Sequence, residues 1–113
     1  SYLAIKAPVV GSIVKLNNLS RIAATLSQML NNHVPLQECL VATYETLGNK
    51  IYKELIIDAQ RNVNNGDFMS QAFEQHYAVE VVFTRMISVG ERTGDLGKML
   101  KNLSIPNIFD NSH

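Results

Sequence analysis

Apolar residues recur every three or four positions along most of this 113-residue chain, and this spacing limits the fold more than any other feature. Such spacing places apolar side chains on one face of an α-helix, whereas a half-buried strand alternates apolar and polar residues. Strand signals do not recur, so the sequence predicts an all-α fold. The first helix would bury one stripe, made of Ile13, Leu16, Leu19, Ile22, Ala23, Leu26, Met29 and Leu30.

Helix-breaking residues divide the apolar pattern into about six helices. The segment from Asn31 to Pro35 ends the first helix, because proline prevents the helix from continuing through the residue before it. Gly48-Asn49 and Asn64–Gly66 end the second and third helices, and Asp67 is expected to cap a short fourth helix. The connections are short, so consecutive helices should be antiparallel neighbours in a compact bundle.

The two ends of the chain are expected to lie outside this bundle. Pro8 and Gly11 indicate that residues 1–10 form an extended lead-in, and Pro106 indicates an irregular tail over residues 104–113. The six-helix domain would then cover residues 11–103. Because Ser1 is not an initiator Met, the sequence is also compatible with a piece cut from a longer protein.

The amino-acid composition favours some classes of protein over others. The content of 46% apolar and 18% charged residues is typical of one globular domain with a modest core. Ten basic residues balance ten acidic ones, so nothing favours nucleic acid as a partner. The single cysteine, Cys39, cannot form an internal disulfide. The longest apolar stretches contain charges and are too short to cross a bilayer, so a soluble domain is expected.

None of the common catalytic or phosphate-binding motifs is complete in this sequence. Gly97-Lys98 lacks the glycine five positions earlier and the Ser or Thr after the lysine that a phosphate-binding loop needs. The chain has no H-E-x-x-H or C-x-x-C pair and no G-x-S-x-G elbow. Cys39 falls at an apolar position of the second helix, where an inert buried thiol is the default. We therefore expect no enzyme activity and no cofactor.

One pair of carboxylates leaves a metal-binding alternative open. Glu91 and Asp95 are four residues apart and would share a face if the helix were continuous, so they could hold Ca²⁺ or Mg²⁺ weakly. The simpler interpretation is structural: Asp95 complements a helix N-terminus, and Glu91 accepts hydrogen bonds from exposed backbone N–H groups.

The segment around these residues resembles a known family signature. MISVGERTGDLGKML (Met86–Leu100) is similar to the G-E-x-[ST]-G-x-L motif of the type II secretion system protein F family and its apolar flanks. The residues that match position by position are Gly90, Glu91, Thr93, Gly94 and Leu96.

Three other segments resemble the same family in the same order. LSQMLNNHVPL (Leu26–Leu36) resembles its first hairpin, with His33 where the family usually has glycine. GDFMSQAF (Gly66–Phe73) is similar to its G-x-x-[LF]-S-x-A-[LF] segment. PVVG (Pro8–Gly11) resembles the lead-in to the second of its two cytoplasmic repeats. The resemblance covers roughly residues 8 to 103.

The resemblance implies a six-helix domain on the cytoplasmic face of the bacterial inner membrane, with transmembrane helices outside this chain. Its implied role is non-catalytic: a platform protein couples an assembly ATPase to pilin or pseudopilin subunits in type IV pilus biogenesis or type II secretion. Other inner-membrane assembly components are implied partners, and self-association as a dimer is implied as well.

The residues of the motif themselves indicate a structural role at the corner between two helices. We expect Gly90 to end the fifth helix, Thr93 to cap the sixth, and Glu91 to hold the corner by accepting N–H groups. Two other functions stay open: a free-standing helical regulatory module that binds a small ligand or protein, and a divalent-metal enzyme that uses Glu91 and Asp95.

Overall fold

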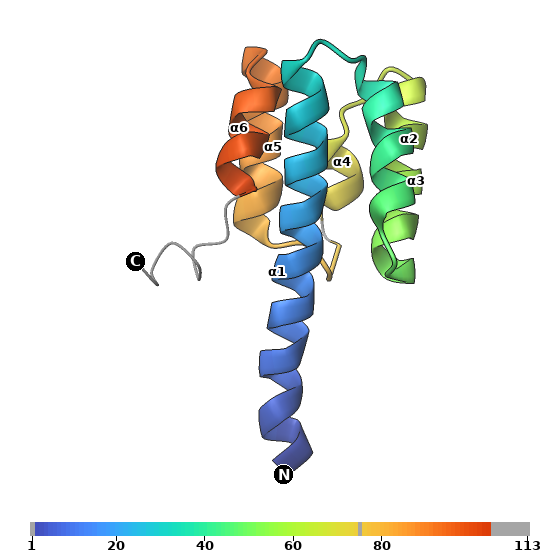
Figure 1. Cartoon of the computed structure of the whole chain (residues 1–113). Helices are drawn as coiled ribbons and strands as arrows, with labels where there is room; N and C mark the ends of the chain where they lie inside the picture. Colours follow the sequence, from blue (N-terminus) through green and yellow to red (C-terminus); the bar gives the residue numbers. More distant parts are fainter. Residues whose placement is uncertain (1, 75, 105–113) are drawn as a thin grey trace.

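The computed structural model describes residues 2–74 and 76–104, with side chains from Ile13 onward, and contains six helices in this part (Figure 1). No strand forms within these residues, so the prediction of an all-α bundle of about six helices is confirmed. The helices are α1 (Tyr2–Asn31), α2 (Leu36–Thr46), α3 (Lys50–Asn64), α4 (Ser70–Phe73), α5 (Val81–Thr93) and α6 (Leu96–Leu103).

The six helices close into a ring. Each helix packs against the next one along the chain, and α1 also packs against α6. The chain direction alternates from helix to helix, as expected for short connections (Figure 1). We call the end that holds the α1–α2 and α5–α6 connections the top, and the end that holds the α2–α3 connection the base. The first half of α1 projects beyond the base (Figure 1).

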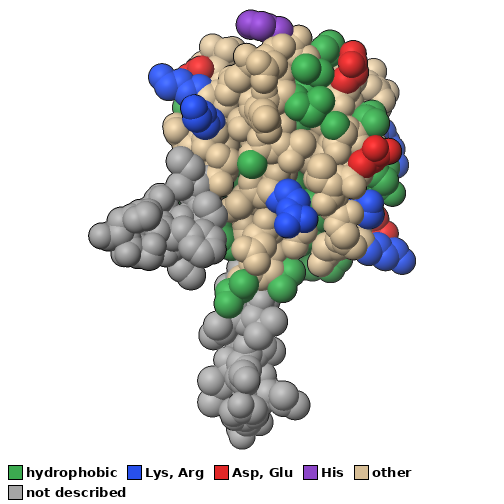
Figure 2. All heavy atoms as spheres, in the orientation of Figure 1, with side chains coloured by type: hydrophobic (Ala, Val, Ile, Leu, Met, Phe, Trp, Pro, Cys, Tyr) green, Lys and Arg blue, Asp and Glu red, His purple; other side chains and the backbone are tan. Residues whose placement is uncertain are grey.

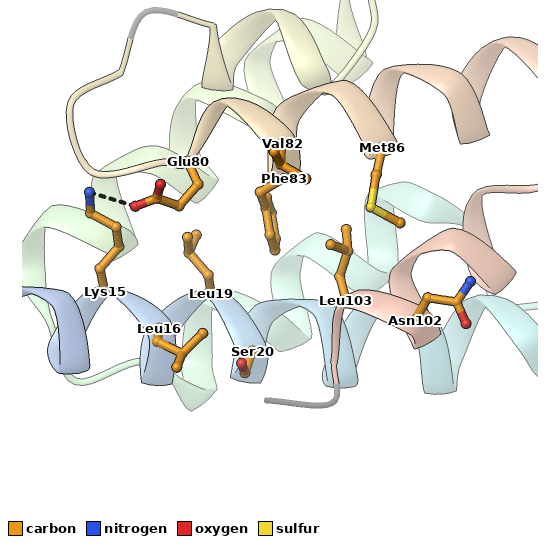
Figure 3. Close-up of a pocket in the computed structure, with 10 residues that line it drawn as sticks. All are labelled: Lys15, Leu16, Leu19, Ser20, Glu80, Val82, Phe83, Met86, Asn102 and Leu103. Carbon is orange, nitrogen blue, oxygen red and sulfur yellow. Dashed lines mark ion pairs between the residues drawn. The ribbon is translucent and has the colours of Figure 1, made fainter. Parts of the chain in front are cut away.

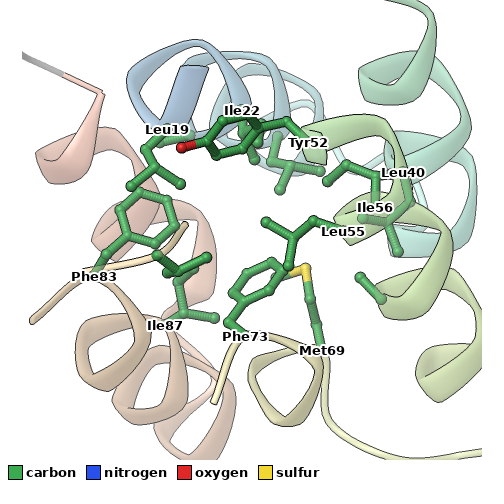
Figure 4. Packing of buried hydrophobic residues seen from close by; sticks show 14 of the residues in the cluster. Leu19, Ile22, Leu40, Tyr52, Leu55, Ile56, Met69, Phe73, Phe83 and Ile87 are labelled. Atoms are coloured by element: carbon green, nitrogen blue, oxygen red, sulfur yellow. The ribbon is translucent and has the colours of Figure 1, made fainter. Parts of the chain in front are cut away.

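The core lies inside this ring and follows the apolar periodicity of the helices (Figure 4). Each fully buried Leu, Ile or Phe side chain stabilises the fold by about 1.5–3 kcal/mol relative to an exposed one. One polar contact crosses the core: the Tyr52 hydroxyl donates to the Ala78 carbonyl oxygen at 2.9 Å. The largest fully buried apolar side chains are Phe73, Ile22, Leu26, Leu40, Leu55, Ile56, Met69, Ile87 and Leu100.

Residues 2–10 are helical and do not form the expected extended lead-in. Helix α1 begins at Tyr2 and includes both Pro8 and Gly11. An interior proline destabilises a helix by about 3 kcal/mol or more. The turns before Pro8 nevertheless extend a helix that is already formed, so they avoid the cost of nucleating a separate helix. The expected tail begins at Ser104, which is the C-cap of α6, and its remainder lies outside the described residues.

Two other boundaries differ from expectation because a different side chain makes the cap. Helix α2 already ends at Thr46, and Asn49 caps the start of α3 by accepting from the N–H of Ile51 at 2.9 Å. Asp67 does not cap α4, which begins only at Ser70. None of the helices in the described part is long and apolar enough to span a membrane.

Candidate functional site

The motif corner is built differently from the expectation. Helix α5 continues through Gly90 and ends at Thr93, so Gly90 does not end the helix. The helix ends at Gly94, which has a φ of 75° and is therefore in the left-handed region that favours glycine. The N–H groups of Gly94 and Asp95 both donate to the Gly90 carbonyl oxygen, the latter at 2.8 Å.

Gly90 has a packing role instead. A Cβ atom built on this residue would lie 2.9 Å from the Cα of Leu96 and 3.1 Å from the Cγ of Met99. The backbone of α6 therefore passes so close to α5 that a side chain at position 90 would have to displace it. The glycine is required by the contact between the two helices.

Thr93 does not cap α6. Its hydroxyl donates to the Val89 carbonyl oxygen within α5 at 2.8 Å, and the residue is exposed. Asp95 occupies the N-cap position of α6 but makes no side-chain capping bond there. This expectation was wrong because the helix runs one turn further than the first glycine of the motif indicated.

Glu91 does accept backbone N–H groups, but from another helix. Its Oε2 accepts from the N–H of Met69 at 2.6 Å, and its Oε1 accepts from the N–H of Ser70 at 3.2 Å. Both donors stand at the start of α4, whose N-cap residue is Met69 and supplies no side-chain acceptor. A carboxylate on α5 thus caps a helix that lies more than 20 residues earlier in the chain.

The condition for a Glu91–Asp95 ion site is not met. The helix is interrupted at Gly94, so the two carboxylates are not on one continuous helical face. Both oxygens of Glu91 also accept backbone hydrogen bonds. Across the described residues, no group of three or more His, Cys, Asp or Glu side chains could hold a metal ion.

A hollow of about 500 Å³ lies at the top of the bundle. Three of the sequence segments with family resemblance meet around it, although they are far apart in the chain. Phe68 is partly exposed here, and its ring lies 5.5 Å from the guanidinium carbon of Arg92. The hollow carries more acidic than basic side chains. The residues from the three segments are Leu30, Asn31 and Leu36, then Asp67 and Phe68, and finally Gly90, Glu91, Gly94, Asp95, Leu96, Gly97 and Lys98.

Gly97 and Phe68, which line the hollow, have roles that the sequence did not predict. A Cβ atom on Gly97 would run into the side-chain amide of Asn31, so this glycine lets α6 approach the end of α1. An isolated glycine within a helical apolar pattern is the signal that could have identified it. The spacing of Phe68 from Ala72 and Phe73 indicated a core position on the fourth helix. This prediction was wrong, because α4 begins only at Ser70 and Phe68 is 40% exposed in the turn before it.

His33 has the backbone conformation that its position requires. Its φ is 67°, the only positive φ of a non-glycine residue in the described part. Its N–H donates to the Leu30 carbonyl oxygen at 3.0 Å, which closes the C-terminal turn of α1. The family that the sequence resembles usually has glycine at this position, and the left-handed backbone explains why glycine is preferred. The His33 side chain is exposed in the connection between α1 and α2, at the top.

A second cavity of about 450 Å³ was not predicted (Figure 3). It lies between α1, α5 and α6, and Leu16, Leu19, Phe83 and Leu103 form much of its apolar wall. At one end, Lys15 and Glu80 form an ion pair of 2.9 Å. Met86, from the flank of the signature segment, lines this cavity, but the five matched signature residues do not.

Cys39 occupies the buried position that the apolar pattern indicated. Its side chain is fully buried, and burial raises the pKa of the thiol above its ordinary value. A thiol held in its protonated form is a poor nucleophile. Its Sγ lies 3.4 Å from the Val34 carbonyl oxygen, so it contributes to packing at the start of α2.

Comparisons with known proteins agree with the resemblance in the motif segments. The family model for protein F of the type II secretion system matches residues 22–105. Type II secretion system protein F of Pseudomonas aeruginosa is 30% identical over 96 residues, which cover 85% of this chain and 24% of the relative. The type IV pilus assembly protein PilC of Thermus thermophilus is 28% identical over 103 residues, which cover 90% and 25%. Protein F of Vibrio cholerae is 30% identical over 96 residues, with the same coverage as the first relative.

These matches cover only part of each relative. The chain spans about a quarter of the length of the curated relatives it matches. Most of the chain, however, lies within the family match, including the hairpin, the segment before α4 and the motif corner. The chain therefore belongs to the type II secretion system protein F family.

Proposed function

We propose that this chain is a non-enzymatic cytoplasmic domain of an inner-membrane platform protein, which couples an assembly ATPase to the assembly of pilin or pseudopilin subunits. Family membership supports this proposal, because the relatives are named for type II secretion and for type IV pilus assembly. Binding of other assembly components, self-association as a dimer and placement as the second of two repeats stay predictions.

The observation that carries the proposal is the meeting of three family segments around the hollow at the top. The hairpin after α1, the turn before α4 and the motif corner contribute to one surface. This surface lies at the end opposite to the one from which α1 projects (Figure 1). We infer that the hollow is where the domain contacts the ATPase.

The motif residues support a non-enzymatic role, because each one has a structural contact. Gly90 allows α5 and α6 to approach, Glu91 caps α4, and Gly94 ends α5. A catalytic carboxylate would need to be available to a substrate, whereas both oxygens of Glu91 accept bonds from the backbone.

Titration calorimetry of this chain with the assembly ATPase of the same organism tests the proposal. Phe68→Ala removes the exposed aromatic ring of the hollow and should raise the Kd by at least about fivefold, as truncation of a central interface aromatic does. Ile57→Ala is the matched control, because Ile57 is 38% exposed on α3 and Phe68 is 40% exposed.

Ile57→Ala should bind the ATPase with an affinity within about twofold of the wild type. If the ATPase does not bind the wild-type chain, or if Ile57→Ala weakens binding more than Phe68→Ala, the hollow is not the contact surface. Circular dichroism at the titration temperature confirms that both variants are folded.

A further inference from the structure

Exposed apolar side chains are concentrated near the base. Of the eleven large hydrophobic residues exposed in the described part, six belong to two neighbouring segments, the first half of α1 and the entry to α5. The three most exposed are Tyr77 at 75%, Val82 at 64% and Val81 at 63%. We call these six residues the base surface: Ile13, Val14, Leu16, Tyr77, Val81 and Val82.

The two segments of the base surface lie side by side. The ion pair between Lys15 and Glu80 joins them, and Leu16 and Val82 border the same cavity (Figure 3). Figure 2 shows hydrophobic side chains along the lower edge of the body, which is the base in this orientation. An exposed group of apolar side chains of this kind usually contacts another apolar body.

Ile13 and Val14 lie on the side of α1 that faces away from the core. At about 100° per residue, Ile13 is rotated by about 180° from Ile22, and Val14 is rotated by about 120° from Leu26. Ile13 is accordingly 48% exposed and Val14 39% exposed. The sequence before Ile13, YLAIKAPVV (residues 2–10), is also mainly apolar. The exposed side chains of Ile13 and Val14 thus face away from the described part of the bundle.

We propose that the base surface docks on a lipid bilayer, with the valines in the interface and Tyr77 at the depth of the headgroups. This inference rests on the proposed function, which makes the inner membrane the neighbouring apolar surface. The relatives are about three and a half times as long as this chain. Both helices through which a longer chain would connect, α1 and α6, point their outer ends toward the base. An exposed tyrosine beside aliphatic residues is typical of a membrane interface.

The charges of the base surface favour hydrophobic docking over electrostatic attraction. Lys15 and Glu80 neutralise each other at 2.9 Å, so this pair leaves no net positive charge for anionic headgroups. Docking should therefore occur on zwitterionic phosphatidylcholine vesicles and change little when anionic phosphatidylglycerol is added.

The chain contains no tryptophan, so a single introduced one reports on its own surroundings. With phosphatidylcholine vesicles, Tyr77→Trp should show a blue shift of its fluorescence and quenching by brominated acyl chains. Val41→Trp is the matched control, because Val41 is 53% exposed on α2 and lies outside the base surface. Its emission should stay unchanged.

Co-sedimentation of the 113-residue chain with the same vesicles measures the binding. The double variant Val81→Glu/Val82→Glu should lower the partition coefficient by at least about tenfold, because two valines would lose their contact with the interface. Val41→Glu should bind like the wild type. All these positions are exposed, so the variants should melt within a few degrees of the wild type.

Three outcomes would overturn the proposal. One is a wild-type chain that stays in the supernatant while Tyr77→Trp shows no shift. Another is binding that requires anionic lipid. The third is a dimer in analytical ultracentrifugation that the double variant abolishes without vesicles, which would assign the base surface to a second copy. ATPase binding separates the two proposals, since Val81→Glu/Val82→Glu should leave it intact and Phe68→Ala should leave vesicle binding intact.

Discussion

The carboxylate of Glu91 supplies to α4 the cap that its own sequence lacks. Helix α4 has only four residues, and a helix this short depends on its surroundings for stability. Two charge-assisted hydrogen bonds from Met69 and Ser70 fix the start of α4 against α5. The family motif thereby joins two helices that are not linked by a short connection.

Replacing Glu91 should therefore destabilise the domain. We expect Glu91→Ala to lower the free energy of unfolding by about 1–3 kcal/mol, because two buried backbone donors lose their acceptor. Glu91→Gln keeps one acceptor oxygen and should lose less. Urea denaturation followed by circular dichroism measures both, and Glu54→Ala on the exposed face of α3 serves as the control. An unchanged melting temperature together with lost ATPase binding would make Glu91 a contact residue.

His33 shows a limit of reading single residues from a sequence. The break at Asn31–Pro35 could be predicted from proline. The left-handed backbone at His33 could not, since a positive φ is uncommon for any non-glycine residue, even for histidine, which is enriched there. The family resemblance indicated a special position there, and the structure gives the physical reason.

At the scale of elements, the contact between α5 and α6 depends on two glycines that do different work. Gly94 is needed for its positive φ, and nothing lies within 4 Å of a Cβ built on it. Gly90 has ordinary helical geometry, but its Cβ would meet the backbone of Leu96. One glycine serves the turn and the other serves the packing.

Gly90→Ala and Gly94→Ala should lower the free energy of unfolding by different amounts. Gly90→Ala should cost about 1–3 kcal/mol, because α6 has to move away from α5. Gly94→Ala should cost about 1 kcal/mol, from backbone strain alone. Gly48→Ala, which has open space and no positive φ, should stay within about 0.5 kcal/mol of the wild type. Equal losses for Gly90→Ala and Gly48→Ala, measured by urea denaturation, would contradict the packing role.

Much of the element order could be predicted from the sequence, because helices depend on local periodicity. Leu19, Ile22, Ala23 and Leu26 are buried as their spacing indicated, but Ile13 and Leu16 of the same predicted stripe are 48% and 37% exposed. These two lie on the part of α1 that reaches past the base, where no other helix in the described part covers them fully. The caps could not be predicted, since the bond between Glu91 and Met69 depends on the tertiary arrangement. The start of α1 at Tyr2, before Pro8, could not be predicted either, because a single proline lowers the stability of a helix without fixing where it begins.

At the scale of the whole molecule, Tyr52 joins two parts of the ring that are not direct neighbours. Its hydroxyl bond to the Ala78 carbonyl oxygen ties α3 to the segment that leads into α5. Burial is the main reason that the pKa of Tyr52 lies above its ordinary value of 10.0, and the nearby Tyr77 and Glu80 raise it further. The folded state therefore favours the protonated tyrosine.

This raised pKa predicts a loss of stability at alkaline pH. The contribution of Tyr52 is complete below the ordinary value of 10.0 and disappears as the pH rises through the higher value of the folded state. Tyr52→Phe should be less stable by about 1 kcal/mol at pH 7, because the Ala78 carbonyl loses its donor. Its unfolding free energy should then fall less steeply than that of the wild type between pH 9 and 11, which urea titrations at each pH would show. Parallel curves would disprove this role.

Helix α1 gives the domain a mechanical property. It is one uninterrupted rod of 30 residues that begins beyond the base and ends at Asn31, on the rim of the hollow. At 1.5 Å per residue the rod is about 45 Å long, so a tilt of about 10° at its lower end would swing the upper end by roughly 8 Å. Because α2 and α6 both pack on α1, the whole body would swing with it. In the platform role that we propose, such a rod would carry a displacement at the base to the hollow at the top.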